Sequence, residues 1–252
     1  MLDICIFLYI NHQLGMQGST ETSCHSDIGF VLDASESLQD ELCPGCYGDE
    51  KNFVIKATRR LDFSSSGAHS SITLYNKQAQ LWIPFSETKT LAEFHKLVSE
   101  LPFQGTGTSR VDEGLQVAYD EMFQTFNGMR VSNPKTLVLI TDGNQLGIDY
   151  LEWRTKFSNA KIRLIVIGVG SEVSGEDLMD LAHNTTDLHF VDNFSDLLND
   201  EFIDKISICD GKFSSCILVY CKVFNQSSIN YNSQLIFSIT CDHRSPSQRS
   251  FQ

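Results

Sequence analysis

The chain has 252 residues, 41% of them hydrophobic, which suffices for one globular domain with an ordinary core and additional flanking segments. Its formal net charge is −13, from 32 acidic and 19 basic residues, which disfavours binding to a nucleic-acid backbone or to an anionic membrane surface. The sequence contains no apolar run of the roughly 18 residues that a membrane-spanning helix needs.

The N-terminal segment Met1–Ile10 is short and apolar, like the hydrophobic part of a secretory signal. It lacks a basic start, however, and it contains Asp3. Two interpretations remain open, a shortened signal peptide and a disordered or mispredicted leader. We assign residues 1–23 to a possible signal peptide or leader.

From Ser26 onward, apolar runs alternate with amphipathic segments. The patterns predict, in chain order, strand 27–32, helix 51–61, strands 70–75 and 81–85, helices 90–101 and 109–126, strand 136–140, helix 148–157, strand 162–169, helix 174–183, strand 188–191 and helix 194–208. This alternation predicts an α/β fold: a Rossmann-like, doubly wound, mostly parallel central sheet flanked by helices. Ligand sites of such sheets lie beyond the carboxyl ends of the strands, where Asp33 and Asp142 each follow a predicted central strand.

The character of the chain changes after Cys209. Residues 210–252 contain further cysteines, two short β-like runs at 216–224 and 234–240, and a polar end. We expect a short Cys-containing tail or the start of a second module, after a main domain at residues 24–209.

Three loops carry oxygen-bearing side chains in a pattern that suits a metal. Asp33-Ala34-Ser35-Glu36-Ser37 brings one carboxylate and two hydroxyls together, and hard cations such as Mg²⁺ prefer oxygen ligands. Taken alone, this string also fits a helix cap or a turn. Two further loops strengthen the metal interpretation, because parallel strands bring them to the same sheet edge: Gly105-Thr106-Gly107-Thr108-Ser109 and Thr141-Asp142-Gly143.

Together, in this order and spacing, the three motifs resemble the metal-ion-dependent adhesion site of von Willebrand factor A domains, which integrin I domains share. The resemblance covers about residues 24–209. It implies metal ligation by Asp33, Ser35, Ser37, Ser109 and Asp142, the last often through water. The second loop of the family normally supplies a Thr, so Ser109 is a departure, and Thr108 is the alternative ligand if the register slips by one.

The resemblance also implies a function. A bound Mg²⁺, or Ca²⁺ or Mn²⁺, keeps one coordination position open for an acidic residue of a protein partner, and few protein carboxylates leave the ion positive enough to attract it. We therefore expect an extracellular cell-adhesion or matrix-binding module that is not an enzyme, with Glu36 pointing to solvent. The alternatives are a structural A domain with a vestigial site, and a metal-assisted hydrolase, which would need a positioned base that the sequence does not offer convincingly.

Eight cysteines avoid the long central stretch 52–208 and cluster at the ends of the main domain and in the tail. This distribution suits an oxidising compartment, and three Asn-x-Ser/Thr sequons, at Asn184, Asn193 and Asn225, add to the expectation of a secreted glycoprotein. In domains of the resembled family a disulfide often ties the two termini, which implies a Cys24–Cys209 bond here.

Cys43-Pro44-Gly45-Cys46 follows the first metal loop and admits three interpretations: a small loop disulfide, a thioredoxin-like redox pair, or half of a zinc site. The redox motif lacks its usual strand-before, helix-after context, and the domain has no second nearby Cys/His pair for zinc. We favour the loop disulfide.

Overall fold

The structure is a computed structural model in which the chain forms two compact units, one spanning Thr20–Gly211 and one combining Met1–Ser19 with Lys212–Gln252. It describes residues 24–209 except 40, 88–89, 106, 144–147 and 183, together with three strands at 5–6, 216–222 and 235–241. The expectations for the rest of the leader and tail, including the sequon at Asn225, fall outside the described residues.

The larger unit is built on a six-stranded sheet with the order β4-β3-β2-β5-β6-β7. All neighbouring strands pair in parallel except β4, which runs antiparallel to β3 at the edge of the sheet. The strands are β2 (Asp27–Asp33), β3 (His69–Tyr75), β4 (Ala79–Ile83), β5 (Lys135–Thr141), β6 (Ile162–Val169) and β7 (Leu188–Val191). The predicted mostly parallel α/β sheet is confirmed.

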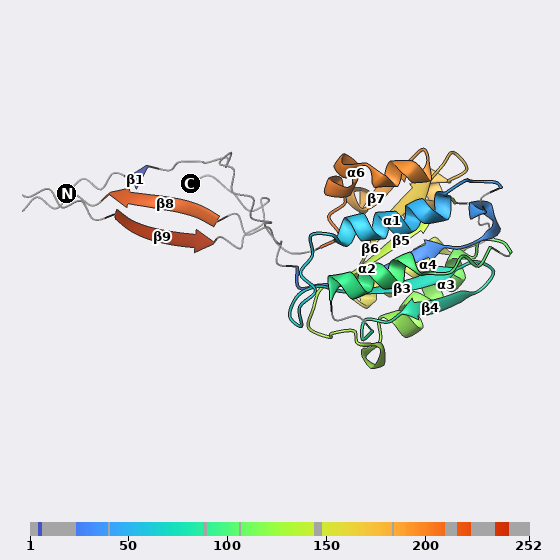
Figure 1. The fold of residues 1–252 in the computed structure, drawn as a ribbon, viewed down its shortest axis with the longest axis horizontal. Coiled ribbons are helices and arrows are strands. Elements are labelled where there is room, and N and C mark those ends of the chain that lie inside the picture. The colour runs from blue at the N-terminus through green and yellow to red at the C-terminus, as the bar shows by residue number, and fades with distance from the viewer. Residues whose placement is uncertain are drawn as a thin grey trace, which may run out of the picture. The chain divides into compact units, whose positions relative to one another are not determined.

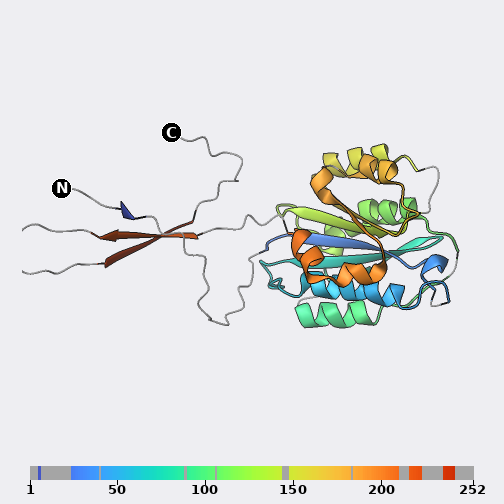
Figure 2. The same cartoon turned by 90° about the horizontal axis from the view of Figure 1, so that it is seen from above.

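Helices cover both faces of this sheet, as Figure 1 and the turned view in Figure 2 show. One face carries α1 (Cys46–Thr58), α2 (Leu91–Ser99) and α6 (Asp200–Lys205). The other carries α3 (Val111–Val117), α4 (Tyr150–Asn159) and α5 (Gly175–Leu181). Each central strand therefore has both faces buried, which explains why the sequences of β5 and β6 are almost entirely apolar, although the buried strand β3 also contains Ser70, Ser71 and Thr73.

Two hydrophobic cores result, one on each side of the sheet. Successive residues of β2 point to opposite faces, so Leu32 packs in the core beneath α1 and α2, whereas Val31 packs in the core beneath α3 and α4. The same alternation holds in β5, where Val138 and Leu139 enter different cores. This packing fixes the register of the strands whose ends carry the three loops.

Three helix predictions were wrong in extent. The helix expected at 51–61 begins earlier, at Cys46, because the chain turns at Gly45, whose φ of +80° suits glycine. The segment 109–126 is not one α-helix: α3 ends at Val117, and η2 (Ala118–Met122, a π-helical turn) and η3 (Thr125–Asn127) follow it.

The helix expected at 194–208 is interrupted at Asn199. It consists of η5 (Phe194–Leu198), a 3₁₀ segment, and α6. The Asn199 side chain accepts the backbone N–H of Glu201 and so caps α6, which ends the preceding turn. Apolar periodicity alone does not show this break.

The end of the larger unit opposite the three loops is held by a disulfide and a buried ion pair. Cys24 and Cys209 are bonded, with Cα atoms 5.9 Å apart, which confirms the bond that the family resemblance implied. Nearby, the buried Asp27 pairs with Arg130 at 2.6 Å, and the Arg130 guanidinium also donates to the carbonyls of Ser26 and Gly67. The two ends of the domain are thus fastened close together.

In the smaller unit, β1 (Cys5–Ile6), β8 (Cys216–Lys222) and β9 (Leu235–Cys241) form an antiparallel sheet in the order β1-β8-β9. The two β-like runs predicted in the tail are therefore strands. In the part of the chain that the structure describes, no helix has the length and apolar character needed to cross a membrane.

Candidate metal centre

The first and second predicted loops are joined by backbone hydrogen bonds at the carboxyl end of β2. The Gly105 N–H donates to the Ala34 carbonyl at 3.1 Å, and the Glu36 N–H donates to the Gly107 carbonyl at 3.2 Å. The Gln39 side chain adds a bond to the Gly105 carbonyl. Positive φ values at Gly105 and Gly107, +55° and +85°, allow the second loop to approach the first this closely.

The Asp33 carboxylate lies at the centre of the site and is fully buried. Its Oδ1 accepts the Ser35 backbone N–H at 2.7 Å, and its Oδ2 accepts the Ser109 hydroxyl at 2.9 Å. A direct side-chain contact thus joins the first loop to Ser109 of the second loop. Thr108, the alternative ligand, is exposed and makes no side-chain hydrogen bond to a described residue.

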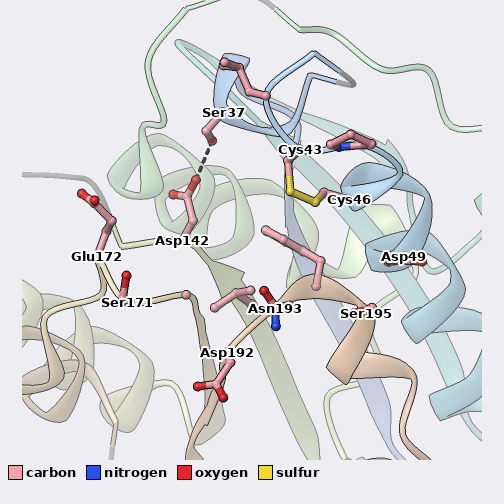
Figure 3. Close-up of a pocket in the computed structure, with 15 residues that line it drawn as sticks. Ser37, Cys43, Cys46, Asp49, Asp142, Ser171, Glu172, Asp192, Asn193 and Ser195 are labelled. Carbon is pink, nitrogen blue, oxygen red and sulfur yellow. Dashed lines mark hydrogen bonds between the residues drawn. A yellow bond between two sulfur atoms is a disulfide. The ribbon is translucent and has the colours of Figure 1, made fainter.

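The network continues from the first loop to the third. The hydroxyls of Ser35 and Ser37 lie 3.0 Å apart, and Ser37 donates to Oδ2 of Asp142 at 2.5 Å (Figure 3). Asp142 directly follows β5, at a turn that continues through Gly143 with φ +82°. The structure therefore brings all five predicted ligands into one connected cluster, while Glu36 between the serines is exposed, as expected.

The electrostatics of the cluster suit a cation. Burial, and secondarily repulsion by Asp142, raise the pKa of Asp33 from 3.8 to about 6. Oδ1 of Asp142 is buried without a hydrogen-bond partner, and no ion pair to a described basic residue neutralises either carboxylate. A bound cation would satisfy the free oxygen and stabilise both negative charges.

The cluster is rich in hydroxyls and poor in carboxylates. Among the described residues no group of three or more His, Cys, Asp and Glu side chains is arranged to hold a metal, so a cation here would take hydroxyl oxygens and water beside the two carboxylates. Such a mixed oxygen set fits Mg²⁺, Ca²⁺ or Mn²⁺ better than a soft metal.

Glu50 is a component of the site that sequence reasoning missed. It lies on α1 and is fully buried, and its Oε1 accepts the backbone N–H of Asp33 at 2.9 Å. A signal was present: with α1 beginning at Cys46, Glu50 precedes the buried Phe53 and Val54 by three and four residues, which places it on the buried face of the helix.

A cavity of about 520 Å³ opens beside Ser37 and Asp142 (Figure 3). The Cys43–Cys46 disulfide lines it, together with the end of β6 and residues that follow β6 and β7. The disulfide agrees both with the small-loop interpretation of the CPGC motif and with an oxidised redox pair, and α1, which begins at Cys46, provides a helix directly after the motif. Because the two sulfur atoms are bonded to each other, they are not available as zinc ligands in this state.

Known proteins are similar to the larger unit in sequence and in fold. The chain is 24% identical over 177 residues to von Willebrand factor of Rattus norvegicus, covering 70% of this chain and 39% of that protein. It is 24% identical to matrilin-1 of Gallus gallus, with coverages of 70% and 36%, and 28% identical to integrin alpha-M of Mus musculus, with coverages of 74% and 16%. The chain thus spans less than half the length of these relatives.

Among solved structures, proximal thread matrix protein 1 from the mussel byssus superposes with a TM-score of 0.67 at 21% identity, over 73% of this chain and 48% of that one. A further structure of that protein, described as having a zinc-occupied MIDAS motif, matches equally well in fold. The model of the von Willebrand factor type A domain matches residues 27–203, a range that contains all three loops. On its sequence and its fold, the chain belongs to the von Willebrand factor type A domain family.

Proposed function

We propose that this chain is an extracellular adhesion or matrix-binding module, not an enzyme, that binds a protein partner through a divalent cation. The ligands of the cation are Asp33, Ser35, Ser37, Ser109 and Asp142. The cation is Mg²⁺, or Ca²⁺ or Mn²⁺, and an acidic residue of the partner completes its coordination shell.

One observation carries the proposal: five oxygen-bearing side chains from three loops form a single hydrogen-bonded cluster that contains only two carboxylates. Two such charges neutralise a divalent ion only in part once water and protein dipoles share the shell, so the ion keeps an affinity for a further anionic oxygen. A carboxylate from another protein supplies that oxygen.

The relatives support an extracellular setting. They include a matrilin, collagen alpha chains and an integrin, and a matrix protein of the same fold has a metal in its corresponding motif. Two disulfides in the described part of the chain agree with secretion, because disulfides persist in oxidising compartments.

Calorimetric titration of the full chain with Mg²⁺ and Mn²⁺ tests the proposal. We expect saturable binding by the wild type, loss of binding in Asp33→Ala, and unchanged binding in Glu36→Ala, a matched control in the same loop whose side chain is exposed. The pair Ser109→Ala and Thr108→Ala tests the second-loop ligand, and only the first substitution is expected to weaken binding. A folded wild type that binds neither ion would instead indicate a structural A domain with a vestigial site.

A further inference from the structure

The Cys43–Cys46 disulfide lies at the start of α1 and lines an open cavity (Figure 3). Pro44 and Gly45, the two residues between the cysteines, are exposed. There is open space beside Gly45, because a Cβ atom there would have no described atom within 4 Å apart from its chain neighbours. A thiol in solution can therefore approach the sulfur bridge while the domain stays folded.

The two sulfur atoms have different surroundings. Cys46 is buried, with 7% of its surface exposed, whereas Cys43 is only half-buried, so an incoming thiolate reaches Cys43 more readily. Attack on Cys43 makes Cys46 the leaving group. Cys46 is the first residue of the 13-residue helix α1, where backbone N–H groups and the helix dipole stabilise a thiolate, although Asp49 in the same turn partly offsets this effect. A stabilised leaving thiolate accelerates disulfide exchange.

Backbone hydrogen bonds hold the two cysteines together independently of the sulfur bond. The Cys46 N–H donates to the Cys43 carbonyl at 3.1 Å, and the Cys43 N–H donates to the Gln39 carbonyl at 2.7 Å. Because these bonds do not involve sulfur, the two thiols of the reduced state stay close to each other. The bridge has a sequence separation of 3, so its reduction also costs less chain-entropy stabilisation than the opening of a long loop.

The other disulfide of the larger unit has the opposite properties. Cys24 is fully buried in the hydrophobic core, and its bond to Cys209 has a sequence separation of 185. A thiolate reaches this bond only after the ends of the domain have opened. The chain thus contains one enclosed structural bridge and one bridge that is accessible to exchange.

We propose that Cys43 and Cys46 form a redox-active pair that oxidises dithiol substrates by disulfide exchange. A thiolate of the substrate attacks Sγ of Cys43, which forms a mixed disulfide and releases Cys46 as a thiolate that takes up a proton. The second thiolate of the substrate then attacks the substrate sulfur of the mixed disulfide. The substrate leaves with its own disulfide, Cys43 takes up the second proton, and a low-molecular-weight disulfide reoxidises the pair. This activity does not depend on the proposed cation site.

Differential alkylation of the folded full chain tests the accessibility of the bridge. The chain is treated briefly with dithiothreitol, quenched with N-ethylmaleimide and digested after glutamate, and the alkylated cysteines are identified by mass spectrometry. Glu36 and Glu41 separate Cys24 from the pair in this digest. We expect Cys43 and Cys46 to be alkylated at least about tenfold faster than Cys24, and oxidised glutathione to restore their bond.

Two single variants test the roles of the two cysteines. In Cys46→Ser the accessible Cys43 should form a mixed disulfide with glutathione, and in Cys43→Ser the buried Cys46 should do so at least about fivefold more slowly. Turnover is measured as the oxidation of a two-cysteine peptide in the presence of oxidised glutathione. The wild type should accelerate this oxidation, and a variant with both cysteines replaced by Ser should not.

Three results would overturn the proposal. The first is reduction of the Cys43–Cys46 bond no faster than that of Cys24–Cys209 in the folded wild type. The second is faster formation of the mixed disulfide at Cys46 than at Cys43. The third is peptide oxidation by the wild type at the rate of the double-Ser variant, which would show that the bridge is an exposed structural disulfide without activity.

Discussion

Oε1 of Glu50 accepts the backbone N–H of Asp33 at 2.9 Å, and both residues are fully buried. Oε2 of Glu50 has no hydrogen-bond partner among the described residues. Burial, with repulsion by Asp33 as the next cause, holds the pKa of Glu50 well above its usual value, which favours the neutral acid. Glu50 therefore holds the backbone of Asp33 in place by a hydrogen bond, and as a neutral acid it adds no negative charge to the candidate metal site.

We expect Glu50→Ala to lower the free energy of unfolding by about 2–3 kcal/mol, because it leaves the Asp33 N–H buried without an acceptor and opens a cavity. Glu50→Gln keeps the acceptor oxygen and the volume, so its stability should lie close to that of the wild type. Urea denaturation of the metal-free proteins measures both values. Equal losses in the two variants would contradict a neutral, hydrogen-bonding role for Glu50.

Mg²⁺ binding should weaken in acid. The pKa of Asp33 is raised to about 6, and a proton on this carboxylate competes with the cation. We expect the apparent Kd to be nearly constant above about pH 7 and to rise about tenfold for each pH unit below about 6. Calorimetry across this range checks the profile, and a Kd independent of pH down to about 5 would rule out Asp33 as the titrating ligand.

The metal-free domain should become less stable as pH rises from about 4 to above 6. In this window the folded chain retains a proton on Asp33 that the unfolded chain has released, so the free energy of unfolding falls with increasing pH. A pKa rise from 3.8 to about 6 corresponds to about 3 kcal/mol.

The variant Asp33→Asn removes this ionisation. In EDTA at neutral pH it should unfold at a higher urea concentration than the wild type, and added Mg²⁺ should stabilise only the wild type. A variant less stable than the wild type in EDTA would show that the hydrogen bonds of the carboxylate outweigh the cost of burying its charge.

The ion pair between Arg130 and Asp27 should contribute strongly to stability because Asp27 is fully buried. Arg130→Met leaves this carboxylate without its partner and should cost about 3–5 kcal/mol. The double variant Asp27→Asn, Arg130→Met should recover part of that loss, since no uncompensated charge remains. A double-mutant cycle in urea measures the coupling energy between Asp27 and Arg130. Losses of stability in the two single variants that simply add up in the double variant would show that the two side chains do not stabilise each other.

The two disulfides of the larger unit should differ in their effect on stability. Cys24–Cys209 closes a loop with a sequence separation of 185, whereas Cys43–Cys46 has a separation of 3. On the chain-entropy account, replacing the first pair with Ser should cost up to about 5 kcal/mol, and replacing the second about 2 kcal/mol. Thermal unfolding of the two double-Ser variants measures the stability that each disulfide contributes. An equal loss of stability in the two variants would show that local strain or packing outweighs the effect of loop length.

The positions of the strands and the mostly parallel sheet, though not the order of the strands, could be predicted from the sequence, because β5 and β6 are nearly continuous apolar runs. The strands β6 and β7 have the predicted bounds, the other predicted strands differ by one or two residues at their ends, and β1 was not predicted. The five ligand candidates followed from the family's motifs once the strand ends were known, and the structure brings them together.

Other features depend on tertiary contacts that local sequence does not encode. The spacing of Glu50 to Phe53 and Val54 places it on the buried face of α1 once the start of the helix is known, but only the structure shows its contact with the Asp33 backbone. Likewise, Asp49, Glu172 and Asp192 lie far apart in the sequence and line the cavity beside Ser37 and Asp142 only because α1 and the segments after β6 and β7 meet there. Sequence periodicity identifies apolar faces, but not which loops will lie side by side.

The position of β2 determines how the domain would carry tension. At one end of this central strand is Asp33, the proposed cation ligand, and three residues before its other end is Cys24, bonded to Cys209. A pull between the segments that precede Cys24 and follow Cys209 passes through the covalent bridge and leaves the sheet unloaded. A pull on Asp33 would instead run along the covalent backbone of β2 to Cys24, while the hydrogen bonds of β2 to β3 and β5 hold the strand in the sheet. Under the proposed function, a single strand would therefore connect the cation ligand Asp33 to the disulfide that joins the two ends of the domain.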